Sequence, residues 1–399
     1  MIREIFDLQN PWRKKRNNLF NLHKRGILPI LIDSLTSKKI VGLLGSRQVG
    51  KSSLMFLLIQ HLLDKSIAPD NIFYFNLDDL KLHQLFEDIP AFLQFVDSNN
   101  SHRKYIFIDE VQRLKNPGLF LKEVYDLGRD IKIIYSGSSQ LEIKSKLKEH
   151  LVGRARQFLI HRLSFEEYLG FSNPNTRKQA LEDTLIYGSY PGVVSETALT
   201  EKKLTIKDIY QSYVEKDLTD FLKIEHLDRL NHLLVLLANQ IGNLLNIDGL
   251  SKALRISRHE VERVLNILEQ TFIIKRIYPF FGNYKKEVVK MPKIYFLDLG
   301  LRNFILNNFN PLFSRNDQGD LFENFFLLEV LNYDYHGLSR VNFWRTTNQT
   351  EIDFIITDES GQRAVEVKWE RKTIPKSFAT LKKYYPEIKP RVVTHHNFL

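Results

Sequence analysis

The segment that most restricts how this chain can fold is Gly45-Ser-Arg-Gln-Val-Gly-Lys-Ser-Ser53. The apolar run Ile40–Leu44 comes directly before it and is typical of a buried strand, and Leu54–Leu63 after it is typical of a helix. The spacing fits GxxxxGK[ST] in the strand, loop, helix order that this motif requires. The sequence therefore predicts an α/β unit built around a phosphate-binding P-loop.

The residue types of this loop suit ATP and Mg²⁺. Its glycines let the backbone wrap the phosphates, and its N–H groups and the helix N-terminus bind anionic oxygens. Lys51 is expected to reach the β- and γ-phosphates, and Ser52 to ligate Mg²⁺. We expect the whole loop to contact the nucleotide: Gly45, Ser46, Arg47, Gln48, Val49, Gly50, Lys51, Ser52 and Ser53.

A second apolar strand, Tyr105–Ile108, ends in the carboxylates of Asp109 and Glu110. The carboxyl edge of a parallel sheet is where open α/β folds bind ligands. We expect Asp109 to hold Mg²⁺ through water and Glu110 to polarise the attacking water, because hydrolysis depends on positioning and charge stabilisation. The alternative is a strand capped by two solvated acids.

Further strands are expected to complete this sheet. Ile72–Asn76 is one, Ile131–Tyr135 is another, and Gln157–Ile160 follows the segment that holds Arg154. After the second of these strands, the hydroxyl of Ser138 could orient the lytic water, although a Ser/Gly loop is also ordinary turn chemistry. Arg154 is a candidate for phosphate stabilisation, with an ordinary surface arginine as the alternative.

The length of 399 residues exceeds what one hydrophobic core usually supports, so several domains are expected. No apolar run reaches bilayer length, the start carries charges, and cysteine is absent, which together predict a soluble cytoplasmic protein without disulfides or thiol chemistry. The net charge of +10 is concentrated in residues 1–40 and 363–399, which we interpret as basic arms. Such arms are either solvated surface or contacts for a polyanion.

The middle of the chain follows a helix-turn-helix pattern. Helices are expected at 230–241, 249–254 and 257–269, followed by a wing that pairs 272–280 with 287–290 around Gly282. This pattern predicts a winged helix, which either binds DNA or serves as a packing module. The candidate DNA contacts are Arg258, His259, Glu262, Arg263, Lys285 and Lys286.

The last hundred residues predict the order αβββαβ, the core order of PD-(D/E)xK nucleases. Glu323 lies on the first helix and Asp353 on the second strand, while Glu366 and Lys368 share one face of the third. Carboxylates suit Mg²⁺, so we expect Glu323, Asp353 and Glu366 to ligate it and Lys368 to support the nucleophile. Charges exposed on a strand are the alternative for the Glu366 and Lys368 pair.

These motifs together resemble the prokaryotic AAA+ ATPases with a C-terminal PD-(D/E)xK nuclease-like domain of unknown function, the AAA-14/DUF4143 type. Segments that carry the resemblance besides the motifs above are 10–12, 153–154, 163–169, 188–192, 293–301, 319–324, 344–345 and 351–354. The resemblance implies that Ser138 belongs to a sensor 1 segment and that Arg154 is a finger for a neighbouring subunit's ATP. A sensor 2 arginine near Gly188 is not evident.

We therefore expect four domains: an AAA+ P-loop ATPase core at 1–170, a helical lid at 171–226, a winged helix at 227–300 and a PD-(D/E)xK-like α/β domain at 301–399. The expected function is ATP hydrolysis coupled to DNA binding and metal-dependent DNA cleavage, by a homo-oligomer such as a hexameric ring, with no membrane partner. Two alternatives stay open: a nucleotide-controlled switch whose nuclease fold only grips DNA or protein, and an ATP-driven remodeller of proteins.

Overall fold

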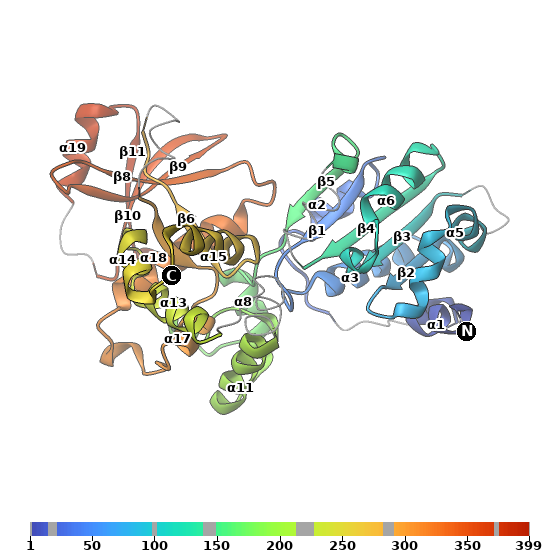
Figure 1. Ribbon diagram of the computed structural model, residues 1–399, viewed down its shortest axis with the longest axis horizontal. Coiled ribbons are helices and arrows are strands. Elements are labelled where there is room, and N and C mark those ends of the chain that lie inside the picture. The colour runs from blue at the N-terminus through green and yellow to red at the C-terminus, as the bar shows by residue number, and fades with distance from the viewer. Residues whose placement is uncertain are drawn as a thin grey trace. The chain divides into compact units, whose positions relative to one another are not determined.

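The computed structural model describes residues 2–14, 22–97, 102–138, 149–212, 227–281, 291–370 and 375–398. Contacts divide the chain into two compact units, Met1–His161 and Arg162–Leu399, and each is considered by itself (Figure 1). The partition into four domains stays a prediction. In the described ranges, no helix is both long and apolar enough to cross a membrane.

The first unit contains, among its described residues, a five-stranded parallel sheet in the order β2-β3-β4-β1-β5 (Figure 1). Most strand residues are buried, as in parallel sheets covered on both faces. Because the strands are parallel, their carboxyl ends meet at one edge. The strands are β1 (Ile40–Leu44), β2 (Ile72–Asn76), β3 (Lys104–Asp109), β4 (Ile131–Gly137) and β5 (Ala155–Leu159).

Helices and an aromatic core cover this sheet. Phe75 lies at the centre of the aromatic cluster and contacts the rings of Phe6, Phe86 and Phe92. Edge and tilted ring pairs of this kind add to the free energy gained from burial. The helices are α1 (Ile2–Gln9), α2 (Leu28–Ser34), α3 (Lys51–Asp64), α4 (His83–Glu87), α5 (Ile89–Val96) and α6 (Pro117–Asp126), with short 3-10 turns η1 (Pro11–Arg13), η2 (Pro69–Asn71), η3 (Leu80–Leu82) and η4 (Val111–Arg113).

The interpretation of residues 1–40 as a basic arm was wrong for its described part. Helix α1 packs on β2, with Phe6 and Trp12 fully buried. The side chain of Asn10 extends the sheet edge, because it donates to the carbonyl of Tyr74 over 2.9 Å and accepts its N–H over 2.8 Å. These contacts join distant segments, so local charge patterning could not reveal them. Residues 363–399 are also folded in their described part, which contains two strands and two helices: β10 (Gly361–Lys368), α19 (Ser377–Tyr384), β11 (Lys389–Thr394) and α20 (His395–Phe398).

The second unit begins with the helices α8 (Phe165–Ser172), α9 (Arg177–Tyr187), α10 (Pro191–Ser195) and α11 (Leu199–Ile209). Helix α8 starts with the capping box of Ser164 and Glu167. After α9, Gly188 has φ +75°, and a Cβ there would clash with the carboxylate of Asp298. That buried carboxylate accepts the N–H of Ser189 over 3.0 Å. The two segments that contain Gly188 and Asp298 therefore have a structural role.

The middle elements are α13 (Leu227–Asn239), α14 (Ile247–Leu254), α15 (Arg258–Gln270), β6 (Ile274–Ile277) and β7 (Lys293–Phe296). As expected, the side chain of Ser257 caps α15. Strand β6 pairs antiparallel with β7. The predicted wing residues 282–290, with Gly282, Lys285 and Lys286, lie outside the described residues, so the winged helix stays a prediction.

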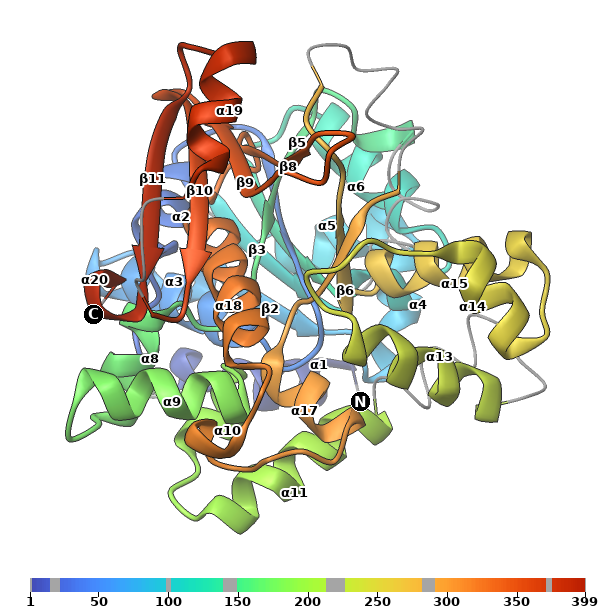
Figure 2. The ribbon, with the colours of Figure 1, turned by 90° about the vertical axis from the view of Figure 1, so that its left-hand side faces the viewer.

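The remaining elements follow the predicted order αβββαβ. They are α17 (Leu299–Ile305), η6 (Leu312–Ser314), α18 (Gln318–Tyr333), β8 (Arg340–Arg345), β9 (Glu351–Asp358), β10 (Gly361–Lys368), α19 (Ser377–Tyr384), β11 (Lys389–Thr394) and α20 (His395–Phe398). In the part of this segment that the structure describes, the sheet order is β11-β10-β9-β8, with β10 and β11 parallel and the other pairs antiparallel (Figure 2).

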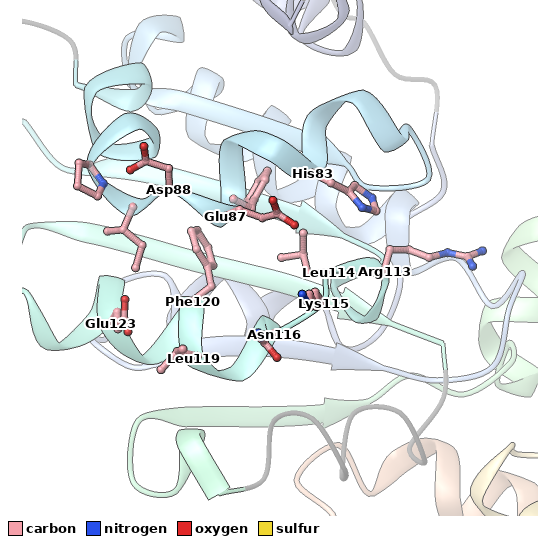
Figure 3. Close-up of a pocket in the computed structure, with 13 residues that line it drawn as sticks. His83, Glu87, Asp88, Arg113, Leu114, Lys115, Asn116, Leu119, Phe120 and Glu123 are labelled. Atoms are coloured by element: carbon pink, nitrogen blue, oxygen red, sulfur yellow. The ribbon is translucent and has the colours of Figure 1, made fainter.

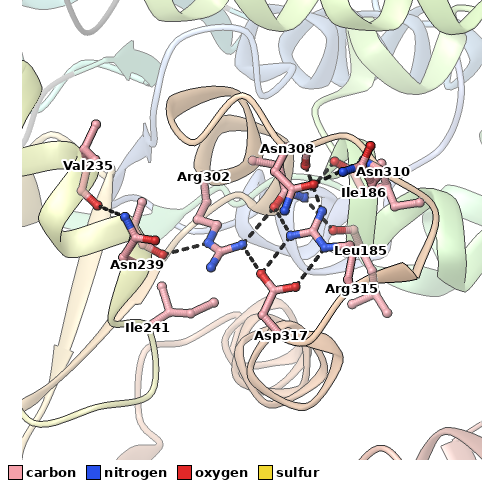
Figure 4. Close-up of polar contacts among 12 residues, drawn as sticks. Leu185, Ile186, Val235, Asn239, Ile241, Arg302, Asn308, Asn310, Arg315 and Asp317 are labelled. Atoms are coloured by element: carbon pink, nitrogen blue, oxygen red, sulfur yellow. Dashed lines mark hydrogen bonds and ion pairs between the residues drawn. The ribbon is translucent and has the colours of Figure 1, made fainter. Parts of the chain in front are cut away.

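A buried polar network joins these elements to the rest of the unit (Figure 4). Asp317, just before α18, accepts from Arg302 over 2.5 Å and from Arg315 over 2.8 Å. Asn303 donates to the carbonyls of Leu185 and Ile186 at the end of α9, each over 2.9 Å. Buried charges with all partners in place resist rearrangement, because removing one partner would leave an uncompensated charge. The network therefore fixes α17 and α18 against α9.

Candidate functional site

The P-loop lies between β1 and α3, as predicted, and close packing fixes its path. A Cβ on Gly45 would clash with the carbonyl oxygen of Ile160, and Gly50 has φ +92°. Arg25 donates to the carbonyl of Val49 over 2.8 Å and to that of His161 over 3.0 Å. Arg25 thus ties the loop to the end of β5, a role that no motif in the sequence indicated.

The side chains of the loop differ in exposure. Val49 and Ser46 are buried, Arg47 is half-buried and Gln48 is exposed. Lys51 is buried, and its ammonium donates to the carbonyls of Gly45 over 3.1 Å and Ser46 over 2.8 Å. Burial lowers the pKa of Lys51, and the carboxylates of Glu110 and Asp109 oppose that shift. Its charge is therefore held against the loop backbone.

The hydroxyl of Ser46 supports a ligand at this loop. Its Oγ is buried and has no hydrogen-bond partner among the described residues. A buried hydroxyl without a partner costs free energy, so such groups usually have a role or a missing partner. A phosphate oxygen is an acceptor that would satisfy it, and the residues present fit a nucleotide phosphate.

The carboxylate of Asp109 lies beside α3 and accepts hydroxyl donors from neighbouring elements. Ser52 donates to Oδ2 over 2.5 Å, Tyr74 donates to the same oxygen over 2.8 Å, and Ser136 donates to Oδ1. A serine hydroxyl beside a carboxylate is an oxygen donor set that suits Mg²⁺. The sequence predicted Ser52 and Asp109 as members of this site, but it did not indicate Tyr74 or Ser136.

Glu110 adopts an unusual backbone conformation, with φ 57°. Its N–H donates to the hydroxyl of Ser136 over 2.9 Å, which supports this strained conformation. Its carboxylate accepts from Ser138 over 3.1 Å and also from Gln112. The structure thus brings Glu110 and Ser138 together, as the sensor prediction requires, and adds Gln112, which also donates to Ser138 over 2.9 Å.

Arg154 lies at the opposite edge of the sheet from the P-loop. Its carbonyl accepts the N–H of Ile40 at the start of β1, whereas the P-loop follows Leu44 at the end of that strand. Its guanidinium donates to Asp126 over 2.7 and 3.0 Å, and this hydrogen bond raises the pKa of Arg154. Arg154 therefore cannot act on the nucleotide of its own chain in this arrangement.

A pocket of about 710 Å³ lies beside the turn that follows Glu110 (Figure 3). No sequence motif predicted it. It opens between α4, α5, η4 and α6, with an apolar floor and a rim of both charges. Its lining residues are His83, Phe86, Glu87, Asp88, Ile89, Pro90, Arg113, Leu114, Lys115, Asn116, Leu119, Phe120 and Glu123.

In the second unit, Asp353, Glu366 and Lys368 converge as predicted. The ammonium of Lys368 lies 2.8 Å from Oε2 of Glu366 and 3.4 Å from Oδ2 of Asp353. Asp353 also accepts the N–H of Val367 over 2.8 Å, and Ser377 donates to Glu366 over 2.5 Å. Burial and the neighbouring Asp353 raise the pKa of Glu366. Buried carboxylates beside an exposed lysine are typical of a functional site.

Glu323 has different partners from those expected. Tyr295 donates to its Oε1 over 2.7 Å, and Lys293 lies 3.4 Å from the same oxygen. Burial, together with the charge of Asp353, raises the pKa of Glu323 to about 7. Among the described residues, no three His, Asp or Glu side chains are close enough to hold a metal ion. This differs from the predicted shell of Glu323, Asp353 and Glu366, because β7 holds the carboxylate of Glu323.

The predicted DNA-contacting side chains on α15 form ion pairs within the protein. Arg258 lies 3.3 Å from Asp248, and Arg263 lies 2.7 Å from Glu260. Glu262 pairs with Arg276 of β6 over 3.2 Å. His259 is exposed. Exposed ion pairs contribute little to stability, so the arginines could exchange these partners for phosphates at small cost.

Models of known protein families match three successive segments of the chain. A family model described as an AAA domain matches residues 37–169, and models described as domains of unknown function match residues 178–312 (DUF8612) and 318–397 (DUF4143).

Relatives are similar over most of the chain. An uncharacterized protein of Methanocaldococcus jannaschii, MJ1637, is 26% identical over 72% of this chain and 66% of its own length. An uncharacterized protein of Haemophilus influenzae is 24% identical over 82% of this chain and 81% of its own length. The ADP form of Aeropyrum pernix ORC2 aligns with 65% of this chain and 89% of its own, at 11% identity and a TM-score of 0.38. The chain thus matches an AAA domain followed by a C-terminal DUF4143 domain, the combination that the sequence resemblance predicted.

Proposed function

We propose that this chain binds ATP with Mg²⁺ at residues 45–53 and hydrolyses it. The observation that carries the proposal is the convergence of Ser52, Asp109 and Glu110 at the carboxyl edge of the parallel sheet. Ser52 and Asp109 would hold Mg²⁺, which when bound neutralises the phosphate oxygens. The loop N–H groups bind the phosphates, and Lys51 gives up its carbonyl contacts for the β- and γ-phosphate oxygens.

Glu110 orients the attacking water and accepts its proton. Hydrolysis of this kind depends on positioning and electrostatic stabilisation more than on covalent chemistry. Ser138 and Gln112 hold the carboxylate of Glu110 in place, and Ser136 links its backbone to the carboxylate of Asp109. The network therefore couples the orientation of the water to the residue that holds the cation.

Phosphate release by the full chain tests this proposal. We expect the wild type to release phosphate from ATP in the presence of Mg²⁺ and Lys51→Ala to lose this activity. Lys65→Ala is the matched control, because Lys65 is exposed at the other end of α3. Absence of turnover by the wild type, or equal turnover by Lys51→Ala, would refute the proposal.

Arg154 serves the nucleotide of a second copy of the chain in this proposal. Its position at the opposite edge of the sheet supports action in trans. An arginine fork stabilises the charge on a transferring phosphoryl group. The active form is then a homo-oligomer, with a hexameric ring as one arrangement, and Arg154 must leave Asp126 on assembly.

We propose as a second function that the C-terminal part cleaves DNA with a divalent metal. The convergence of Asp353, Glu366 and Lys368 supports this function. Asp353 and Glu366 would hold Mg²⁺, which binds through one or two carboxylates and several waters and activates water when bound. Lys368 would stabilise the charge on the phosphodiester, and α15 would bind the DNA backbone.

Cleavage assays separate this function from its alternatives. We expect the wild type with Mg²⁺ or Mn²⁺ to cut supercoiled, linear or branched DNA, and Asp353→Asn to cut none while keeping ATP turnover. Lys376→Ala is the control, because this exposed lysine precedes α19 next to Ser377. If the wild type cuts no DNA but binds it in an ATP-dependent way, the nucleotide-controlled switch replaces the nuclease. If the wild type binds no DNA either, the ATP-driven protein remodeller replaces the nuclease.

A further inference from the structure

Lys293 is a buried lysine beside the carboxylates of the proposed metal site, although it belongs to β7 and lies outside the αβββαβ elements. Its side chain is only 3% exposed. The ammonium lies 2.6 Å from Oε1 of Glu351 and 3.4 Å from Oε1 of Glu323. It also lies over the ring of Phe343, 5.6 Å from its centroid. Burying the charge of a lysine costs free energy unless the ammonium is paired, so these contacts stabilise Lys293 in its buried position.

The charges around this lysine are nearly balanced without any metal. Four carboxylates each lie within 3.4 Å of a cationic nitrogen: Glu323, Glu351, Asp353 and Glu366. One cation, Lys368, serves Asp353 and Glu366. The other two carboxylates form ion pairs with two further cations. Lys293 pairs with Glu323 and Glu351, and Arg345 pairs with Glu351.

We propose that Lys293 is a resident cation that restricts this cluster of carboxylates to one divalent metal ion. Its ammonium occupies the position between Glu323 and Glu351 where a second ion would need oxygen ligands. Asp353 and Glu366 remain as the ligands of the single ion, so the inference rests on the proposed metal-binding function. Tyr295 is a positioning residue, because its hydroxyl holds Glu323 against Lys293.

Strand β7, in the middle part of the chain, contributes two residues to the carboxylate cluster of the C-terminal part. Lys293 and Tyr295 come from the strand that pairs with β6, directly after α15. Strand β7 thus carries residues that balance the charge of these carboxylates. A compact ammonium is strongly attracted to carboxylates but cannot activate water as a divalent ion does. The carboxylates next to Lys293 therefore differ in chemistry from Asp353 and Glu366, the proposed ligands of the metal ion.

The test counts bound Mn²⁺ on the full chain without nucleotide, by electron paramagnetic resonance and calorimetry. We expect one ion for the wild type and two for Lys293→Met, because Glu323 and Glu351 then lack the ammonium. Glu351→Gln added to Lys293→Met should return the count to one. Lys275→Met is the matched control, since Lys275 lies opposite Tyr295 on β6 and pairs with Glu269.

The outcomes separate this inference from the proposed nuclease. Two ions on the wild type, or the same number and affinity in Lys293→Met, would overturn the role of Lys293. No ion on the wild type but one on Lys293→Met would support Lys293 while removing the proposed metal site. If Lys293→Met is unstable, Lys293→Gln and the rise in melting temperature with Mn²⁺ report the same binding. No such rise in either variant would also overturn it.

Discussion

Hydroxyl groups define the acidic site of the first unit at the scale of single residues. Ser52 and Tyr74 donate to one oxygen of Asp109, and Ser136 donates to the other. Ser136 also accepts the N–H of Glu110, so it is the residue through which both acids are positioned. These hydroxyls therefore set the orientation of the two acids.

Ser136→Ala should reduce kcat for ATP hydrolysis more than Ser138→Ala does. A lost hydrogen bond to a charged group costs about 1.5–3 kcal/mol, which corresponds to roughly tenfold to a hundredfold in rate. Ser136 contacts both Asp109 and Glu110, whereas Ser138 reaches only Glu110 of the two. Steady-state kinetics with saturating ATP measures the ranking, and a larger loss in Ser138→Ala would contradict it.

Glu329 should make stability depend on pH. It lies in α18, and both its carboxylate oxygens accept the N–H of Phe165 at the start of α8. Burial raises the pKa of Glu329 to about 7 from an ordinary 4.5. The folded state therefore holds this proton more tightly than the unfolded state does, and stability falls as pH rises from about 4.5 to about 7.

Replacing Glu329 by Gln should remove that loss, which is on the order of 3 kcal/mol. The amide oxygen still accepts the N–H of Phe165, so the variant should melt at a higher temperature than the wild type at pH 8. At pH 5 the two should be close. Thermal melting at both pH values measures the difference, and an equal drop in both proteins would contradict the role of Glu329.

At the scale of elements, periodicity and motifs were sufficient for the strands of both sheets. The predicted strands 40–44 and 72–76 match β1 and β2, and the elements of the C-terminal segment follow the predicted order αβββαβ. Buried strands and amphipathic helices carry local signals, because burial repeats with the period of the element. The motifs also predicted correctly that Ser52 lies near Asp109.

Contacts between distant segments could not be predicted in this way. Tyr74, Ser136 and Arg25 reach the site from other elements, and nothing in their local sequence distinguishes them from core or surface residues. Helix α1 was missed because its charges suggested an arm. Lys293 was noted only as part of a resemblance, since its partner Glu323 is thirty residues away.

Gly45→Ala should disrupt the P-loop as an element. The added Cβ would clash with the backbone oxygen of Ile160, which no side-chain motion can relieve. We expect at least a tenfold loss of ATP affinity and a lower melting temperature. Gly170→Ala, in α8, has open space around its Cβ and should be neutral or slightly stabilising. Normal ATP binding by Gly45→Ala would contradict this account of the loop.

At the scale of the whole molecule, the position of Arg154 makes assembly part of the proposed function. We expect ATP turnover per chain to rise with protein concentration. Mixing Arg154→Ala with Glu110→Gln should restore part of the lost activity, because each variant completes a shared site with the other. Turnover independent of concentration, with no recovery on mixing, would show that Arg154 does not act between chains.

The measurement that most directly tests the central claim compares binding and turnover of Mg-ATP in Lys51→Ala and Glu110→Gln. In the proposed function Lys51 contacts the phosphates, so its loss should weaken nucleotide binding at least a hundredfold, on the order of 3 kcal/mol. In the same proposal Glu110 positions water, so Glu110→Gln should bind ATP within a few-fold of the wild type and hydrolyse it at least a hundredfold more slowly. Equal loss of binding in both variants, or wild-type turnover by Glu110→Gln, would contradict the roles assigned to these residues.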